Sequence, residues 1–303
     1  MTTWEDTETD ASSRPSPAGT PLKPHRHAWL RELLIVLGFY YVYQTIRSLA
    51  DVPGVKNRAH GNAHWLVEAE KTLYIFHEQG IQQVFLGANW FIKVMNVYYG
   101  TLHFIITAGL LVWLFAKRHG AYRVMRNLLG ATTGLALIGY WAFPLAPPRL
   151  YLQCDGDIPV LGEGGGLVKP KCFVDTLDKI GGLWDYQSSA AKAIANAYAA
   201  MPSLHFGWAL WCAIVIWRHV GGRKGHILAV LYPALTLFAI VVTANHYFLD
   251  AVGGTIILFG GLGVSRWSER RRSARHAAAL QELAMAEEGH QDRERAYAGG
   301  TAE

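Results

Sequence analysis

The stretch TANHYFLDAVGGTIILFGGLGV (residues 243–264) places a histidine and an aspartate directly before a long apolar run. A bilayer core about 30 Å thick requires roughly twenty apolar residues in a helix that crosses it. Comparable runs recur from residue 29 onward, and 51% of all residues are hydrophobic whereas only 17% are charged. The sequence therefore predicts an integral membrane protein with ionisable side chains at the end of a span.

Six apolar segments have about the length of a membrane span. They cover residues 29–50, 90–116, 124–145, 199–218, 226–245 and 248–266. An isolated strand would leave its backbone groups without hydrogen-bond partners in lipid, so each segment is predicted to be a helix. The predicted fold is all-α, a polytopic membrane protein with a bundle of six transmembrane helices.

The two ends of the chain differ in composition from its apolar centre. Residues 1–25 are rich in Ser, Pro and Thr and are predicted to form a disordered cytoplasmic tail. Residues 26–266 form the predicted membrane domain. Residues 267–303 are predicted to form a charged cytoplasmic tail that begins as a helix and fades into disorder.

Positive charge is distributed in a way that predicts the topology. Basic segments follow the second, fourth and sixth predicted spans, and the positive-inside rule assigns such segments to the cytoplasm. We therefore expect both termini in the cytoplasm, the protein in the plasma (inner) membrane, and residues 51–89 and 146–198 outside. The net charge of +5 is divided among these segments, which argues against nucleic-acid binding.

The two external segments carry further expectations. Residues 51–89 combine helical periodicity with charges, so they are predicted to lie along the membrane surface or to form a connecting helix packed on the bundle. In the second segment, Cys154 and Cys172 are candidates for a disulfide if the compartment is oxidising. Asp175 and Asp178 are expected to be solvated. Cys212 lies within a predicted span as a small apolar filler.

Ionisable residues are predicted to meet at the outer ends of the spans. His205 lies 16 residues before Gly221, which is roughly 24 Å of helix at ~1.5 Å per residue. His246 lies 21 residues after Gly225, which is roughly 31 Å by the same rise. Both histidines are thus expected near the outer face. Asp250 lies four residues beyond His246, on the same helical face.

The chemistry of this set fits phosphoryl transfer. A neutral imidazole attacks phosphorus, while a carboxylate on its other nitrogen fixes the tautomer and stabilises the developing cation. We assign the nucleophile to His246 and the orienting base to Asp250, and His205 would protonate the departing alkoxide. Arg149 follows the prolines of FPLAPPRLY (residues 143–151) and would neutralise the phosphoryl oxygens. Ser203 is either a further phosphate donor or a helix N-cap.

The blocks MPSLH (residues 201–205) and NHYFLD (residues 245–250) resemble signature blocks of the PAP2 (type 2 phosphatidic acid phosphatase) superfamily. The resemblance covers roughly residues 60–265 and is strongest to the branch similar to inositol phosphorylceramide synthases. It implies a six-helix membrane bundle in which His205, His246 and Asp250 act without a metal or cofactor. The predicted function is a lipid phosphatase or phosphotransferase acting at the outer leaflet through a phosphohistidine. Its partners are a lipid phosphate or phosphodiester, the bilayer and a hydroxyl acceptor.

The chain departs from the phosphatase branch of that superfamily at cationic positions. That branch usually carries a lysine and an arginine in its first block, where only Arg149 stands here, and an arginine six residues before the nucleophile, which is Ile240 here. The glycine of a PSGH block is Leu204. Fewer cations favour a transferase-like reaction or a phosphodiester substrate. Lys169 and Lys171 of the external loop are candidates for the missing charge.

Other interpretations of the same residues stay open. His205, His246 and Asp250 also form a plausible zinc set. In a transporter or channel, polar residues would line a path, but these cluster at one face and do not continue across the midplane. A non-catalytic membrane scaffold would keep the fold without the reaction. His103, within the second predicted span, either is a buried histidine satisfied by a neighbour, bonds an active-site group or lines the lipid entry.

Overall fold

The described part of the chain is built from helices. The computed structural model describes residues 54–153, 172–183 and 198–299, together with isolated positions between residues 29 and 41. Contacts divide the chain into two units, Met1–Tyr43 and Gln44–Glu303. The few described positions of the first unit are helical. The predicted tail at residues 1–25 and most of the predicted span at residues 29–50 lie outside the described residues.

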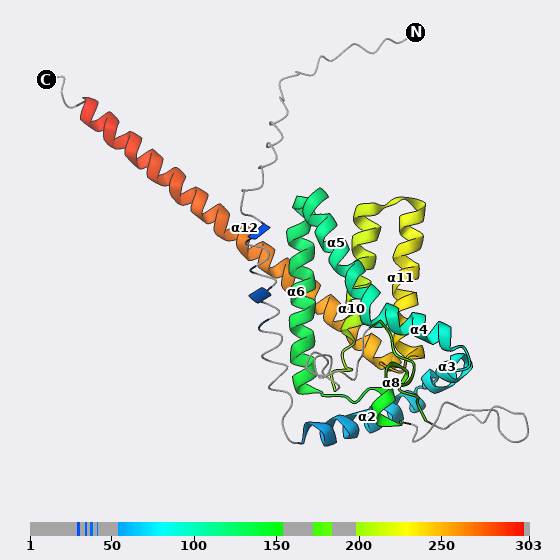
Figure 1. The fold of residues 1–303 in the computed structure, drawn as a ribbon. Helices are drawn as coiled ribbons and strands as arrows, with labels where there is room; N and C mark the ends of the chain where they lie inside the picture. The colour runs from blue at the N-terminus through cyan, green and yellow to red at the C-terminus, as the bar shows by residue number, and fades with distance from the viewer. Residues whose placement is uncertain are drawn as a thin grey trace, which may run out of the picture. The chain divides into compact units, whose positions relative to one another are not determined.

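Figure 1 shows the helices of the second unit. In chain order they are α2 (Val55–Thr72), α3 (Glu78–Phe85), α4 (Asn89–Val97), the π-helical turn η1 (Tyr98–Leu102), α5 (His103–Lys117) and α6 (His119–Ala142). They continue with α7 (Pro148–Tyr151), α8 (Thr176–Lys179), α10 (Leu204–Val215), the π-helical turn η2 (Ile216–Val220), α11 (Gly222–Val242) and α12 (Phe248–Gly299). Helices α5, α6, α10 and α11 stand side by side, and α2 lies across one end of them.

The last five predicted spans correspond to helical stretches of the structure. Among the described residues, three stretches are long and apolar enough to cross a membrane, namely Asn89–Lys117, Gly222–Val242 and Phe248–Leu283. The all-α membrane fold is therefore confirmed, whereas the number of six spans stays a prediction. The last helix is much longer than the predicted span at residues 248–266, because the stretch AAALQELAMAEE (residues 277–288) consists of strong helix formers.

The centre of the bundle is closed by large apolar side chains and by glycines. Leu114, Met125, Trp211 and Leu258 are buried in one cluster contributed by α5, α6, α10 and α12. Near the predicted histidine pair, Gly207 and Gly254 let the backbones of α10 and α12 approach each other closely. A Cβ atom added at Gly254 would overlap the carbonyl oxygen of Ser203 and lie 3.2 Å from the amide nitrogen of Gly207.

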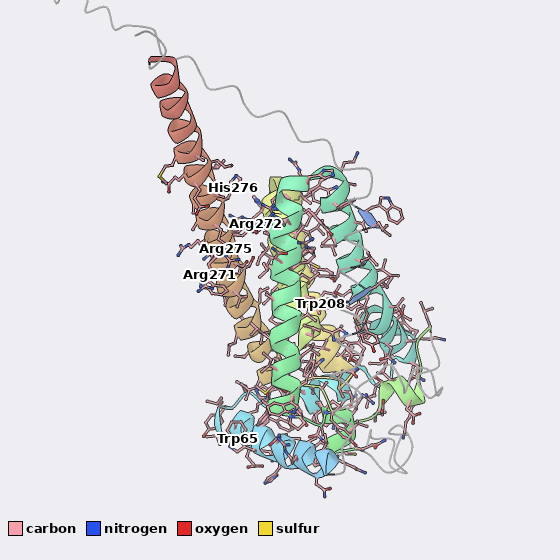
Figure 2. The ribbon with its side chains drawn as sticks, turned by 90° about the vertical axis from the view of Figure 1, so that its left-hand side faces the viewer. Trp65, Trp208, Arg271, Arg272, Arg275 and His276 are labelled. Carbon is pink, nitrogen blue, oxygen red and sulfur yellow. The ribbon has the colours of Figure 1, made fainter. Side chains whose placement is uncertain are left out.

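Helix α2 is a connecting helix packed on the bundle. Its buried face carries Ala59, Ala63 and Leu66, which contact Leu145 and Tyr247 near the starts of α7 and α12. On its other face, Trp65 is 63% exposed and is labelled in Figure 2. Of the two alternatives for residues 51–89, the structure contains the packing on the bundle, and a location along the membrane surface stays a prediction. Between α2 and α3, Tyr74 has a left-handed φ of +58°.

The glycine contact between α10 and α12 generates a prediction. Gly254→Ala is expected to push α10 away from α12, because the added methyl group meets backbone atoms that cannot rotate aside. Overpacking of this kind costs about 1–3 kcal/mol, and we expect a lower Tm in detergent. The matched control is Gly263→Ala on the same helix, since a Cβ there meets no atom within 4 Å. Equal stabilities of the two variants would contradict the close packing.

Candidate active site

His246 and Asp250 form a buried pair at the start of α12. The Nδ1 atom of His246 lies 2.9 Å from the carbonyl oxygen of Ala200 and 3.2 Å from Oδ2 of Asp250. A carbonyl oxygen only accepts, so Nδ1 carries the proton and Nε2 is the basic nitrogen. Burial lowers the pKa of His246, which lies in the loop between two candidate spans. The ring is therefore held neutral, in the tautomer that a nucleophile requires.

The backbone around His246 is bent to present the ring. Helix α11 ends at Val242, and Ala244 then adopts a left-handed conformation with a φ of +54°. The amides of Asn245 and His246 both donate to the carbonyl of Ile240, which closes the helix end. A left-handed alanine costs of order 1 kcal/mol, so this turn is maintained by the contacts around it.

His205 reaches the same place from the first turn of α10. Its ring centroid lies 5.7 Å from that of His246 and 4.2 Å from that of Tyr99, on which it stacks. The ring also hydrogen-bonds to the backbone of Tyr99. The structure thus brings both histidines and Asp250 together, from two segments more than forty residues apart in the sequence.

Ser203 is the N-cap of α10. Its Oγ accepts a hydrogen bond from the amide of Phe206 at 3.4 Å, and its own amide donates to the backbone carbonyl of Asp250 at 2.8 Å. The side chain is fully buried. Of the two alternatives for Ser203, the N-cap is the one that the structure contains, and the phosphate contact stays a prediction.

The π-helical turn η1 supplies a wall of aromatic side chains that sequence reasoning missed. Tyr99 belongs to this turn and contacts both catalytic candidates, since its ring centroid also lies 6.4 Å from that of His246. Such turns recur at functional sites because they shift the register of a helix by one residue. The sequence contains no local signal for the turn, because YYGTLHF also fits an ordinary helix.

His103 follows directly after the π-helical turn and is fully buried. Its Nδ1 atom lies 2.9 Å from the hydroxyl of Tyr232, and its ring centroid lies 5.2 Å from that of His205. Of the three alternatives for this residue, the structure contains the buried histidine that a neighbour satisfies. Its Nε2 atom has no hydrogen-bond partner among the described residues, so it touches His205 without bonding to it, and the role in lipid entry stays a prediction. Trp208 of α10, labelled in Figure 2, stacks on His103, with 6.3 Å between the two ring centroids.

Arg149 lies beside the histidines and is held in place by three contacts. Its backbone amide donates to the carbonyl of Ala244, and its Nε donates to Oδ1 of Asn245 at 2.9 Å. Its Nη1 lies 2.6 Å from Oδ2 of Asp175, with which it forms an ion pair. The prediction that Asp175 is solvated is wrong, because its carboxyl group is buried and paired with this guanidinium. Asp178, in the same loop, is exposed as predicted.

The segment that carries Asp175 is fixed by buried amides. Gln82 forms two hydrogen bonds of 2.9 Å with the backbone of Val174, one as donor and one as acceptor. Asn96 donates to the carbonyls of Thr176 and Gly181, at 2.8 Å each. A connecting loop would not normally be buried, and this one is because α3 and α4 satisfy its backbone groups.

The remaining residues singled out in the sequence do not belong to this group of side chains. Lys169, Lys171 and Cys154 lie outside the described residues. Cys172 is disulfide-bonded, and Cys212 is a free, buried cysteine as expected. Within the described ranges, no three His, Cys, Asp or Glu side chains are arranged to hold a metal ion.

Comparisons with known proteins point to a family. A model of the PAP2 superfamily matches residues 64–264. The inositol phosphorylceramide synthase catalytic subunit aur1 of Schizosaccharomyces pombe is 28% identical over 168 residues, which are 52% of this chain and 36% of that protein. The match thus spans about a third of the length of that relative. No solved structure matches the chain significantly.

The Arg149–Asp175 ion pair generates a prediction about stability. Removing either partner by Arg149→Ala or Asp175→Ala leaves the other charge largely buried, which typically costs about 3 kcal/mol. The double variant is expected to be less destabilised than the sum of the two, as measured by thermal unfolding in detergent. The same cycle on the exposed pair Glu68–Lys71 is the control, with a coupling below about 1 kcal/mol. Additive losses at Arg149 and Asp175 would contradict the pairing.

Proposed function

The chain belongs to the PAP2 superfamily, and on that premise we propose that it is a membrane-embedded lipid phosphatase or phosphotransferase that works through a phosphohistidine. One observation carries the proposal. The ring of a neutral His246, oriented by Asp250 and the carbonyl of Ala200, lies next to a second histidine, with 5.7 Å between the two ring centroids. A nucleophile with its orienting carboxylate and a separate proton donor are the parts that displacement at phosphorus requires.

In the first half-reaction, Nε2 of His246 attacks the phosphorus atom. A P–N bond forms as the P–O bond to the leaving alkoxide breaks, and protonated His205 gives that alkoxide its proton. The Nδ1–H of His246 stays bonded to Asp250, whose charge stabilises the imidazolium of the phosphohistidine. Arg149, which is bonded to Asn245 next to the nucleophile, supplies positive charge that balances the phosphoryl oxygens.

The second half-reaction reverses these roles. Water or a lipid hydroxyl attacks the phosphohistidine, His205 takes up the proton of the attacking O–H group, and the P–N bond breaks. Water as acceptor gives hydrolysis, and an alcohol gives head-group transfer. Two observations favour transfer with a phosphodiester as donor: the described residues bring a single guanidinium to the site, and the chain is similar to a protein named inositol phosphorylceramide synthase.

The distribution of charge supports a site that faces the exterior. Figure 2 shows Arg271, Arg272, Arg275 and His276 on α12, away from the end of the bundle at which Trp65 and α2 lie. The histidine pair belongs to the α2 end, because Tyr247 packs against α2. If the basic segments are cytoplasmic, the substrate reaches the site from the outer leaflet.

A panel of donors and acceptors tests the activity. Purified protein in detergent or vesicles would be given phosphatidate, polyprenyl phosphate and phosphatidylinositol, each with and without alcohol acceptors. We expect phosphate release or a new phosphodiester from at least one donor. The absence of any product, together with a solute flux that depends on His246, would instead support a transporter.

The assigned roles predict different defects for the two histidines. His246→Ala is expected to abolish turnover and the trappable phosphoenzyme, because no other group forms the P–N bond. His205→Ala is expected to slow turnover by about 10²–10⁴-fold yet still form the phosphoenzyme from a donor with an activated leaving group. His119→Ala, at the exposed start of α6, is the control. Retained turnover in His246→Ala would remove the assigned nucleophile.

Metal removal gives a further prediction. Activity is expected to survive incubation with EDTA, because an imidazole and a guanidinium supply the nucleophile and the positive charge that a metal would otherwise provide. The measurement is the rate of product formation before and after chelation, with back-addition of Zn²⁺ and Mg²⁺. A loss that either ion restores would favour the zinc alternative.

A further inference from the structure

Two buried glutamates lie behind the catalytic candidates and have no role in the reaction described so far. Glu70 is in the last part of α2 and Glu78 is the first residue of α3, and both are completely buried. Glutamate is almost never fully buried unless it is paired, since its charged form loses hydration. Their location therefore requires specific partners.

Those partners are backbone amides at the start of α12. Leu249 donates its N–H to Oε1 of Glu70 at 2.8 Å, and Phe248 donates its N–H to Oε1 of Glu78 at 2.9 Å. The preceding amide, of Tyr247, donates to Oδ2 of Asp250 at 2.9 Å. Three consecutive amides at this helix start are thus satisfied by three carboxyl groups, two of which come from other helices.

The remaining oxygens of the two glutamates face one another without an ordinary donor. Oε2 of Glu70 and Oε2 of Glu78 are buried and have no hydrogen-bond partner among the described residues. The Glu78 carboxyl is nevertheless within hydrogen-bonding reach of Glu70. Two carboxylate oxygens only accept, and a proton shared between them would satisfy both.

The electrostatics of the pair agree with its geometry. Burial, together with the hydrogen bond and the charge of Glu78, raises the pKa of Glu70 to about 9. The other groups that face the pair are also acidic or neutral, namely Asp250 and the buried phenol of Tyr247 at the start of α12. One shared proton leaves the pair with a single negative charge, which the dipole of α12 stabilises because the pair lies at the N-terminus of that helix.

We propose that Glu70 and Glu78 share one proton and act as positioning residues, a carboxyl clamp that fixes the start of α12 and so aligns His246 and Asp250. The inference rests on the proposed function in so far as the aligned groups are catalytic. It assigns the clamp no contact with the substrate. The clamp joins three helices through the amides that immediately follow His246, so any shift of α2 or α3 moves the candidate nucleophile.

Loss of the shared proton is expected to open the clamp. The folded pKa of Glu70 lies above its ordinary value of 4.5, so folding binds this proton, and the stability that it contributes is fully present below pH 4.5. That stability falls as the pH rises and is lost as the pH passes about 9. Above that pH, Glu70, Glu78 and Asp250 all carry charge and repel one another.

Substitutions of Glu70 separate a shared proton from simple packing. In Glu70→Gln, the amide oxygen accepts from Leu249 and the NH₂ group donates permanently to Glu78, so the clamp no longer depends on pH. In Glu70→Ala, both contacts are lost. Glu68→Gln, on the exposed side of the same helix, is the matched control.

The first readout is hydrogen exchange of the backbone amides of residues 247–251, which requires no turnover. We expect Glu70→Ala to raise their exchange by about tenfold or more, whereas Glu70→Gln and Glu68→Gln match the wild type at neutral pH. Near pH 10, the wild type is expected to exchange faster than Glu70→Gln at the same pH. Equal exchange in Glu70→Ala and Glu68→Gln, or in the wild type and Glu70→Gln near pH 10, would overturn the clamp.

The second readout is the pH profile of kcat on a donor that the wild type turns over. Glu70→Ala is expected to lower kcat by about tenfold with a smaller change in KM, and Glu70→Gln is expected to restore kcat and extend the alkaline limb. An alkaline limb that Glu70→Gln leaves unchanged would overturn the shared proton. If the wild type turns over no donor, the proposed function fails, while the exchange experiment still decides the clamp.

Discussion

The site depends on the way in which residues 200–203 dock on the start of α12. Two hydrogen bonds make this contact, one from Nδ1 of His246 to the carbonyl of Ala200 and one from the amide of Ser203 to the carbonyl of Asp250. The first sets the tautomer of His246, and the second places the N-cap of α10, so that His205 follows two residues later. Because Gly254 and Gly207 lack side chains, the two helices come close enough for both bonds to form.

The ionisable groups around this contact are paired in a consistent way. Arg149 is bonded to Asn245 beside His246, and its partner Asp175 holds it in position through a segment that Gln82 and Asn96 fix. On the opposite side, Glu70 and Glu78 satisfy backbone amides rather than cations. A phosphate that enters the site would thus meet one guanidinium on one side, and the acidic groups lie behind the backbone of α12, where they support the helix start.

Much of this arrangement follows from the sequence because membrane spans obey strict physical limits. The length of the apolar runs gives the helices, and counting along them brings His205 and His246 to one end of the bundle. Contacts made by long-range packing could not be found in this way. The sequence does not reveal the ion pair of Asp175, because its partner Arg149 is 26 positions away. Glu70 and Glu78 belong to a segment whose charges predict only a helix along the membrane surface or packed on the bundle. Tyr99 was missed because a π-helical turn changes which residues face the site.

The central claim is that His246 is the nucleophile and that His205 stands across the phosphoryl group from it. An experimental structure with vanadate, which adopts the geometry of a phosphoryl group in transfer, tests this claim most directly. The account predicts vanadium bonded to Nε2 of His246, with His205 contacting the apical oxygen on the far side and Arg149 contacting an equatorial oxygen. Vanadate bonded to His205, or bound away from both rings, would contradict it.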